Sequence, residues 1–192
     1  MSGKLCLIAE ECGTDKGAIG HNYTPKYEEL LGHLADSNIT MLEIGVDKGF
    51  SMHMWHRFFT RASIIGMDIN FDRLNGLRLD EDLKRRCPRV TLVQGDQSNW
   101  RDVLHVCKDF GPFDFVVDDG SHITEDQLRS FCYIFPLFIK PGGYYFIEDL
   151  SGTITADILR DFEASELKKY FGIASMERAG NLDNMLVVKR TW

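Results

Sequence analysis

The sequence predicts an α/β fold with a Rossmann-like, doubly wound and mostly parallel sheet that ends in an antiparallel hairpin. Short runs of branched and aromatic residues alternate with amphipathic segments, as expected for parallel strands that helices bury on both faces. Two further apolar runs near the C-terminus are separated only by a turn, which predicts the hairpin. With 192 residues, 44% of them hydrophobic, the chain can bury a sizeable core. We expect one domain over 1–192, with a helical cap or lid over 1–38 and the Rossmann-like core over 39–192.

Each predicted parallel strand ends near a glycine or an aspartate. These strands cover 39–45, 62–69, 90–96, 113–119 and 142–149, and the hairpin strands cover 172–178 and 184–190. Helices are predicted over 24–34, 50–59, 71–79, 98–109, 124–139 and 155–171. Two helix starts carry local signals: Thr24 as N-cap with Pro25 in the first turn, and Thr124 with Gln127 at capping-box spacing. The Met, Trp and Phe side chains of the 50–59 helix are expected in the core.

Charge and composition argue against several classes of function. The formal net charge of −7 disfavours nucleic acid and anionic membranes as partners, and suits a small neutral or cationic ligand or a metal ion. No apolar stretch is long enough to span a membrane and the N-terminus lacks a signal-peptide pattern, so we expect a cytoplasmic protein. The five cysteines are odd in number, widely spaced and without a CxxC pair, which predicts reduced structural thiols.

The first three strand ends carry a pattern suited to a nucleoside-containing ligand. "LEIGVDKG" places Glu43, Gly45 and Gly49 at a strand, a turn and a helix start, where open α/β sheets bind ligands. The spacing departs from the GxGxxG dinucleotide fingerprint, which makes a nicotinamide dehydrogenase a weaker alternative. Asp68 ends the second strand and is suited to accept hydrogen bonds from ribose hydroxyls, and Asp96 ends the third strand.

The fourth and fifth strand ends supply a cluster of acids and a histidine. "DDGSH" contains Asp118, Asp119 and His122, and "IEDL" contains Glu148 and Asp149. Carboxylates packed together repel one another unless a cation neutralises them, and a hard divalent ion such as Mg²⁺ takes oxygen ligands. The histidine could then remove a proton from a hydroxyl of the substrate. Taken singly, each acid could instead cap a turn and the histidine could be a local hydrogen-bonding residue.

These motifs resemble two nested families. The glycine loop, Asp68 and Asp96 resemble the class I S-adenosylmethionine-dependent methyltransferases. The metal-dependent sugar O-methyltransferases are similar over about residues 12–150, through "GTDKG" (13–17), "YTPKYEELL" (23–31), "LEIGVDKGFSMHMW" (42–55), "GDQS" (95–98), "DDGSH" (118–122) and "GGYYFIEDL" (142–150).

The resemblance implies a cofactor, a metal and a site. S-adenosylmethionine would be the methyl donor, and Mg²⁺ or another divalent cation would bind Asp119, Glu148 and Asp149. His122 would be the general base, acting with Asp119. Asp118 would lie behind the metal ligands or on the cofactor side. The residues expected to contact the cofactor are Thr14, Lys16, Glu43, Gly45, Gly49, Ser51, Asp68, Asp96, Gln97 and Asp118.

The sequence and the resemblance identify the methyl acceptor only as a class, a sugar hydroxyl. The segment after the "IED" triplet is shorter than in macrolide-sugar enzymes, which favours a short saccharide such as a mannoside, with a glycosylated natural product as the other option. A catechol or another small diol, and a non-catalytic S-adenosylmethionine-binding protein, remain alternatives. The family and the short acceptor region also make a homodimer an expectation.

Overall fold

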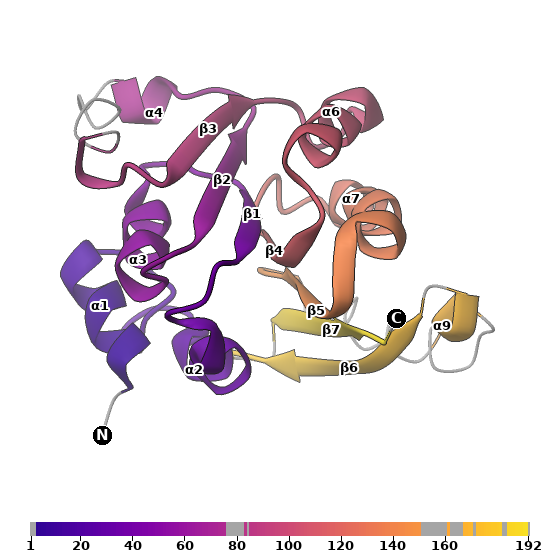
Figure 1. Cartoon of the computed structure of the whole chain (residues 1–192), viewed down its shortest axis with the longest axis horizontal. Coiled ribbons are helices and arrows are strands. Elements are labelled where there is room, and N and C mark those ends of the chain that lie inside the picture. The colour runs from indigo at the N-terminus through magenta and orange to yellow at the C-terminus, as the bar shows by residue number, and fades with distance from the viewer. Residues whose placement is uncertain are drawn as a thin grey trace.

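The strands of the computed structural model form one mixed sheet. The structure describes residues 3–75, 83, 85–150, 161, 167–170, 172–181 and 184–191. Within these, the strands are β1 (Thr40–Ile44), β2 (Ser63–Asp68), β3 (Val90–Gln94), β4 (Phe113–Asp118), β5 (Ile139–Ile147), β6 (Ile173–Ala179) and β7 (Met185–Arg190). They are ordered β3-β2-β1-β4-β5-β7-β6 (Figure 1). The first five run parallel, whereas β7 pairs antiparallel with both β5 and β6. The predicted Rossmann-like sheet with its terminal hairpin is confirmed.

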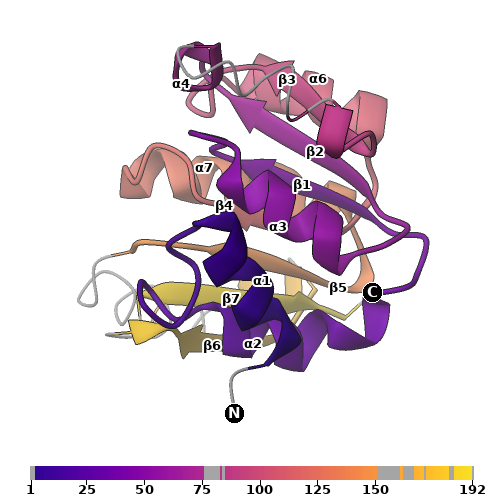
Figure 2. The same cartoon turned by 90° about the vertical axis from the view of Figure 1, so that its left-hand side faces the viewer.

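Helices cover both faces of this sheet. One layer holds α1 (Lys4–Cys12), α2 (Thr24–Leu31), the 3₁₀ turn η1 (Gly32–Leu34) and α3 (Phe50–Phe58), and the other holds α6 (Trp100–Phe110) and α7 (Thr124–Phe138) (Figures 1 and 2). Two short helices complete the described elements, α4 (Asp72–Asn75) and α9 (Leu167–Tyr170). No helix in the described parts of the chain has the length and apolar composition needed to cross a membrane.

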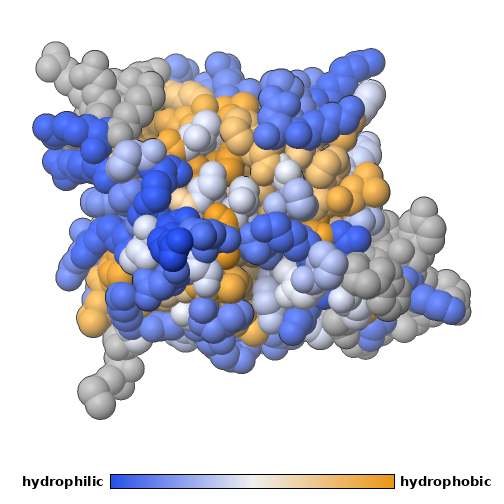
Figure 3. Space-filling model, in the orientation of Figure 1, coloured by the Kyte–Doolittle hydropathy of each residue, from blue (hydrophilic) through white to orange (hydrophobic). Residues whose placement is uncertain are grey.

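The core divides at the sheet because neighbouring strand residues point to opposite faces. Met41 and Phe115 belong to the cluster under α1, α2 and α3, whereas Leu42 and Val116 belong to the cluster under α6 and α7. The large side chains expected in the core from the 50–59 segment are buried there: Met52, Met54, Trp55, Phe58 and Phe59. The edge strand β3 is only half-buried, and Figure 3 shows hydrophobic surface in that part of the molecule.

Two predicted helix caps were wrong. Helix α2 begins at Thr24 with Tyr23 in the N-cap position, and the Thr24 hydroxyl is buried without a hydrogen-bond partner. Helix α7 begins at Thr124 with Ile123 as N-cap and no side-chain cap. In both cases the threonine lies one residue too far into the helix to accept from the amides that a cap satisfies.

The other differences from the sequence prediction concern which helices and strands form and where they begin. Helix α1 was not predicted, although Leu5, Ile8, Ala9 and Cys12 have the helical spacing that marks a buried face. Strand β5 begins three residues earlier than predicted. Most of the predicted helix over 155–171 and the second half of the helix over 71–79 lie outside the described residues. The five cysteines are free thiols, and all but Cys132 are buried.

Candidate active site

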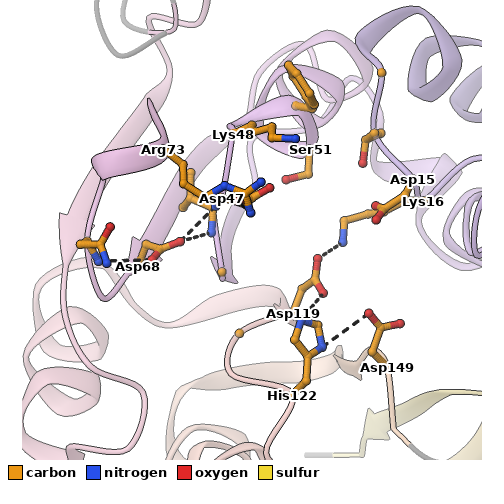
Figure 4. A pocket seen from close by; sticks show the side chains of 17 residues that line it. Asp15, Lys16, Asp47, Lys48, Ser51, Asp68, Arg73, Asp119, His122 and Asp149 are labelled. Carbon is orange, nitrogen blue, oxygen red and sulfur yellow. Dashed lines mark hydrogen bonds and ion pairs between the residues drawn. The ribbon is translucent and has the colours of Figure 1, made fainter. Parts of the chain in front are cut away.

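A pocket of about 580 Å³ lies at the carboxyl ends of the parallel strands (Figure 4). Its walls come from the loop after α1, the glycine loop between β1 and α3, the end of β2, the end of β4 and Asp149 after β5. Thr14 and Lys16 line it together with Gly45, Ser51 and Asp68. Segments more than 100 residues apart in the sequence therefore meet at the edge where an open α/β sheet binds its ligand.

The glycine loop is shaped by close backbone contacts. Gly45 has φ +91°, and a Cβ at this position would lie 1.9 Å from the carbonyl oxygen of Asp119. The Asp68 carboxylate accepts hydrogen bonds from the amides of Val46 and Asp47, at 2.7 and 3.0 Å. Asp68 thus fixes the loop and also faces the pocket. Gly49 precedes α3 with φ +77° and packs against leucine side chains, so its role is to start the helix.

A smaller cavity of about 130 Å³ opens beside the first, between the ends of β1, β2 and β3. Asp96 and Gln97 line it, as does Asp68, which the two cavities share. Asp96 accepts hydrogen bonds from the amide and hydroxyl of Ser98. Four of the predicted cofactor residues therefore line this cavity, because Gly45 of the glycine loop also belongs to its wall.

Asp118 does not line either cavity. It is fully buried, accepting from Gln97 Nε2 at 2.6 Å and from the Tyr145 hydroxyl at 3.0 Å. Gln97 Oε1 in turn accepts from the amide of Ser121. Burial raises the pKa of Asp118 to about 7, against the lowering effect of these hydrogen bonds. The structure thus removes Asp118 from the cofactor surface and gives it a supporting position behind Gln97.

We expect Tyr145→Phe to lower the free energy of unfolding by about 1–3 kcal/mol, because a buried oxygen of Asp118 loses its donor. Denaturant titration at constant pH measures the free energy of unfolding of the variant and of the wild type. Tyr144→Phe, which removes a hydroxyl from the opposite face of the same strand, is the matched control and should change the value by less than about 0.5 kcal/mol. Equal losses in the two variants would contradict a special role for the Tyr145 hydroxyl.

Glu43 is also buried rather than exposed to the pocket. Its Oε2 accepts from the Ser51 hydroxyl at 2.9 Å and from Trp55 Nε1 at 3.0 Å, whereas Oε1 has no hydrogen-bond partner. Burial raises its pKa to about 7, although Lys16 opposes the shift. Glu43 therefore acts beneath the glycine loop, by holding Ser51.

Asp119, His122 and Asp149 form a group in which one ligand atom from each lies within 4.8 Å of the others. His122 Nδ1 is 3.5 Å from Asp149 Oδ2, and His122 Nε2 is 3.9 Å from Asp119 Oδ1. His122 and Asp149 both have left-handed backbone, with φ +56° and +57°. Such strained positions concentrate at functional sites. The three side chains point toward one another in Figure 4.

Glu148, the remaining predicted metal ligand, lies outside this group. It is 1% exposed, and its two oxygens contact the Tyr27 hydroxyl and Lys16 Nζ. Lys16 Nζ also lies 2.5 Å from Asp119 Oδ2. Burial opposes the charge of Lys16, but Asp119, Glu148 and Glu43 raise its pKa well above the usual value. Lys16, which was predicted to contact the cofactor, lines the pocket and also forms ion pairs with these buried acids.

The loop after α1 carries His21 and Tyr23, which the family likeness made candidate liners of the cofactor or acceptor site, and both contact Asp149. The Tyr23 hydroxyl donates to Asp149 Oδ1 at 2.6 Å, and Tyr23 stacks on His21, whose Nδ1 lies 3.5 Å from the same oxygen. These contacts fix Asp149 from the side opposite to His122. "GHNY" at 20–23 signals only a polar turn, so the partner of each side chain could not be found from local pattern.

Curated O-methyltransferases are similar to this chain. An 8-demethyl-8-alpha-L-rhamnosyl tetracenomycin-C 2'-O-methyltransferase from Streptomyces olivaceus is 37% identical over 76% of the chain. A mycinamicin VI 2''-O-methyltransferase from Micromonospora griseorubida is 35% identical, also over 76%. The chain spans only 37% and 36% of the lengths of these two relatives.

A solved structure and a family model agree with this likeness. The MycE methyltransferase of the mycinamycin biosynthetic pathway, solved in complex with Mg and SAH, matches with a TM-score of 0.79 and 27% identity. That match covers all of this chain and 56% of the other. A family model described as a methyltransferase domain matches residues 42–150, from β1 to the end of the "IEDL" motif. With more than half of its residues matched by that model, the chain belongs to the methyltransferase-domain family.

Proposed function

We propose that the chain is an S-adenosylmethionine-dependent, Mg²⁺-dependent O-methyltransferase that acts on a sugar hydroxyl. The observation that carries the proposal is the convergence of Asp119, His122 and Asp149 in one pocket with the glycine loop and Asp68. By their names, the two relatives above are O-methyltransferases of a rhamnosyl tetracenomycin and of mycinamicin VI, and MycE was solved with Mg and SAH. These likenesses support the same cofactor pair and a glycoside acceptor.

The cofactor would lie along the glycine loop. Asp68 keeps acceptor capacity for ribose hydroxyls, because the amides of Val46 and Asp47 share Oδ2 and Oδ1 accepts one long hydrogen bond, 3.3 Å from the amide of Asn70. Asp96 and Gln97 would border the base in the smaller cavity. Thr14 and Ser51, which line the larger pocket, would lie nearer the methionine part.

The residues at the acidic end fit a divalent cation. Asp119 and Asp149 offer the carboxylate oxygens that Mg²⁺ prefers, and Glu148 would be the third acid. When bound, the cation would polarise an acceptor hydroxyl and lower its pKa. An imidazole nitrogen of His122 would take the proton from that hydroxyl. His122 is 47% exposed, so an acceptor can reach it from the open side of the pocket.

The pocket also suggests which acceptors fit. Its five aspartates outnumber its basic side chains Lys16, Lys48 and Arg73, so an anionic sugar would be repelled more than a neutral glycoside. A rhamnoside, a mannoside or a glycosylated natural product meets this condition. We also propose a role in polysaccharide biosynthesis, as a pathway that would use such an acceptor, and the cytoplasmic location and the homodimer stay predictions.

The test is a methylation assay with S-adenosylmethionine, MgCl₂ and a panel of a rhamnoside, a mannoside, a uronate and a catechol. We expect S-adenosylhomocysteine to form with a neutral glycoside, and the rate to fall at least a hundredfold when EDTA removes the metal. Turnover of the catechol alone would favour the diol alternative. Cofactor binding in calorimetry without turnover of any acceptor would favour the non-catalytic alternative.

A further inference from the structure

Lys16 lies among three carboxylates at the ends of β1, β4 and β5. Its side chain is 1% exposed, and Nζ contacts Glu148 Oε2, lies 2.5 Å from Asp119 Oδ2 and lies 3.5 Å from Glu43 Oε1. Two of these acids, Asp119 and Glu148, belong to the set proposed to bind the cation. A single ammonium is thus shared between the proposed metal ligands and a buried acid outside that set.

The oxygen of Glu148 that Lys16 contacts is the one that a cation would need. Glu148 Oε1 accepts from the Tyr27 hydroxyl beneath the site, which leaves Oε2 as the oxygen that can turn to a cation. Asp119 differs, since Oδ2 is bonded to Lys16 whereas Oδ1 faces His122 and can still meet a cation. An ammonium at this position therefore competes with a divalent ion for Glu148 Oε2 and holds the second oxygen of Asp119.

Glu43 offers Lys16 a second acceptor. Ser51 and Trp55 both donate to Glu43 Oε2, whereas Oε1 is buried without a hydrogen-bond partner. A charge-assisted N–H···O bond measures about 2.8 Å. Nζ lies 3.5 Å from Oε1, so a shift of less than about 1 Å would complete this bond.

The backbone that carries Lys16 is fixed, so such a shift needs only the side chain. The carbonyl of Lys16 accepts from the amides of Tyr23 and Thr24 at 3.0 and 3.1 Å. The same loop is joined to the C-terminal hairpin by Asn181, which donates to the carbonyls of His21 and Gly20. Four side-chain torsions of lysine provide the movement without any change in the loop.

We propose that Lys16 is a positioning residue that holds Glu148 and Asp119 until a divalent cation binds. Lys16 then moves onto Glu43 Oε1 as Glu148 Oε2 becomes a cation ligand. Lys16 remains an ammonium throughout, and no proton is transferred. The inference rests on the proposed function, because it concerns the cation of that reaction. It gives Glu43 a second role besides holding Ser51: its Oε1 would receive the Lys16 ammonium when a cation binds.

Calorimetric titration with Mg²⁺ tests this exchange. Lys16→Met should bind Mg²⁺ at least tenfold more tightly than the wild type, whereas Lys48→Met, which removes another pocket lysine, should change the affinity less than threefold. Glu43→Gln should weaken binding about tenfold in the wild-type background and less than threefold in the Lys16→Met background. Weaker or unchanged binding by Lys16→Met, or an equal effect of Glu43→Gln in both backgrounds, would overturn the exchange.

A second measurement uses the wild-type protein, since Lys16→Met leaves buried acids without a counter-ion and could fail to fold. Protons of a buried ammonium exchange slowly enough to be followed by NMR of ¹⁵N-labelled lysine. We expect the Lys16 ammonium signal to shift on Mg²⁺ addition, and Glu43→Gln to need about tenfold more Mg²⁺ before its signal shifts. Mg²⁺ binding by the wild type without that shift would refute the exchange alone. Failure of the wild type and Lys16→Met to bind Mg²⁺ would refute the metal part of the proposed function, and the exchange with it.

Discussion

Replacing His122 with alanine is expected to lower kcat for methyl transfer by about 10²–10⁴-fold, the usual contribution of a positioned general base. The imidazole lies between Asp119 and Asp149, 3.9 and 3.5 Å from their carboxylates, and it is exposed enough to meet an acceptor. These carboxylates flank the ring on two sides at the edge of the pocket. Binding of S-adenosylmethionine should change little, because the glycine loop and Asp68 are untouched.

Steady-state kinetics with a neutral glycoside measure the expected loss of kcat. Calorimetry with S-adenosylhomocysteine tests whether binding of the cofactor product is unchanged. His105→Ala is the matched control, because His105 also lies near an aspartate, Asp109, but on the exposed surface of α6. It should keep kcat within about twofold. Near-wild-type turnover by His122→Ala would remove His122 from the role of base. A parallel loss of cofactor affinity would show instead that His122 supports the pocket.

The parts of the site that end strands could be predicted from the sequence. A buried strand is marked by its apolar run, so the residue that follows the run must lie at the sheet edge. Asp68, Asp96 and Asp119 were placed in this way, and the structure brings each to a cavity at that edge. The prediction succeeds because the pattern and the position have the same physical cause, which is burial of both sheet faces.

The direction of each carboxylate could not be predicted in this way. Asp118 and Asp119 are adjacent, and alternation along β4 sends Asp118 into the layer under α6 and α7, where Gln97 and Tyr145 bind it. The burial pattern shows two acids but not which one faces the pocket, and only the family resemblance assigned Asp119 to the cation. Lys16 was missed as an internal cation for a different reason. Its partners Asp119 and Glu148 lie 103 and 132 residues away, and no local pattern links them.

Replacing Gly45 with alanine is expected to lower the free energy of unfolding by roughly 2–5 kcal/mol, the sum of backbone strain and overpacking. At φ +91°, the new Cβ would lie 1.9 Å from the Asp119 carbonyl oxygen, which is a backbone atom that cannot rotate away. The amide of Asp119 donates to the carbonyl of Ile44, so relief would have to separate the ends of β1 and β4. That movement would displace Asp119 and weaken Mg²⁺ binding as well.

Gly142→Ala provides the control for strain alone, because Gly142 has φ +79° and a Cβ there would meet nothing within 4 Å. We expect it to lose only about 1–2 kcal/mol, the usual penalty for a left-handed alanine. Denaturant unfolding of the two variants, with Mg²⁺ titration under native conditions, gives both quantities. Equal stability losses in the two variants would mean that the contact with the Asp119 carbonyl costs nothing beyond backbone strain. An unchanged Mg²⁺ affinity in Gly45→Ala would mean that β1 and β4 can separate without moving Asp119. The glycine would then serve the loop alone, whereas the expected difference would tie the glycine loop and the proposed metal ligand Asp119 to a single backbone contact.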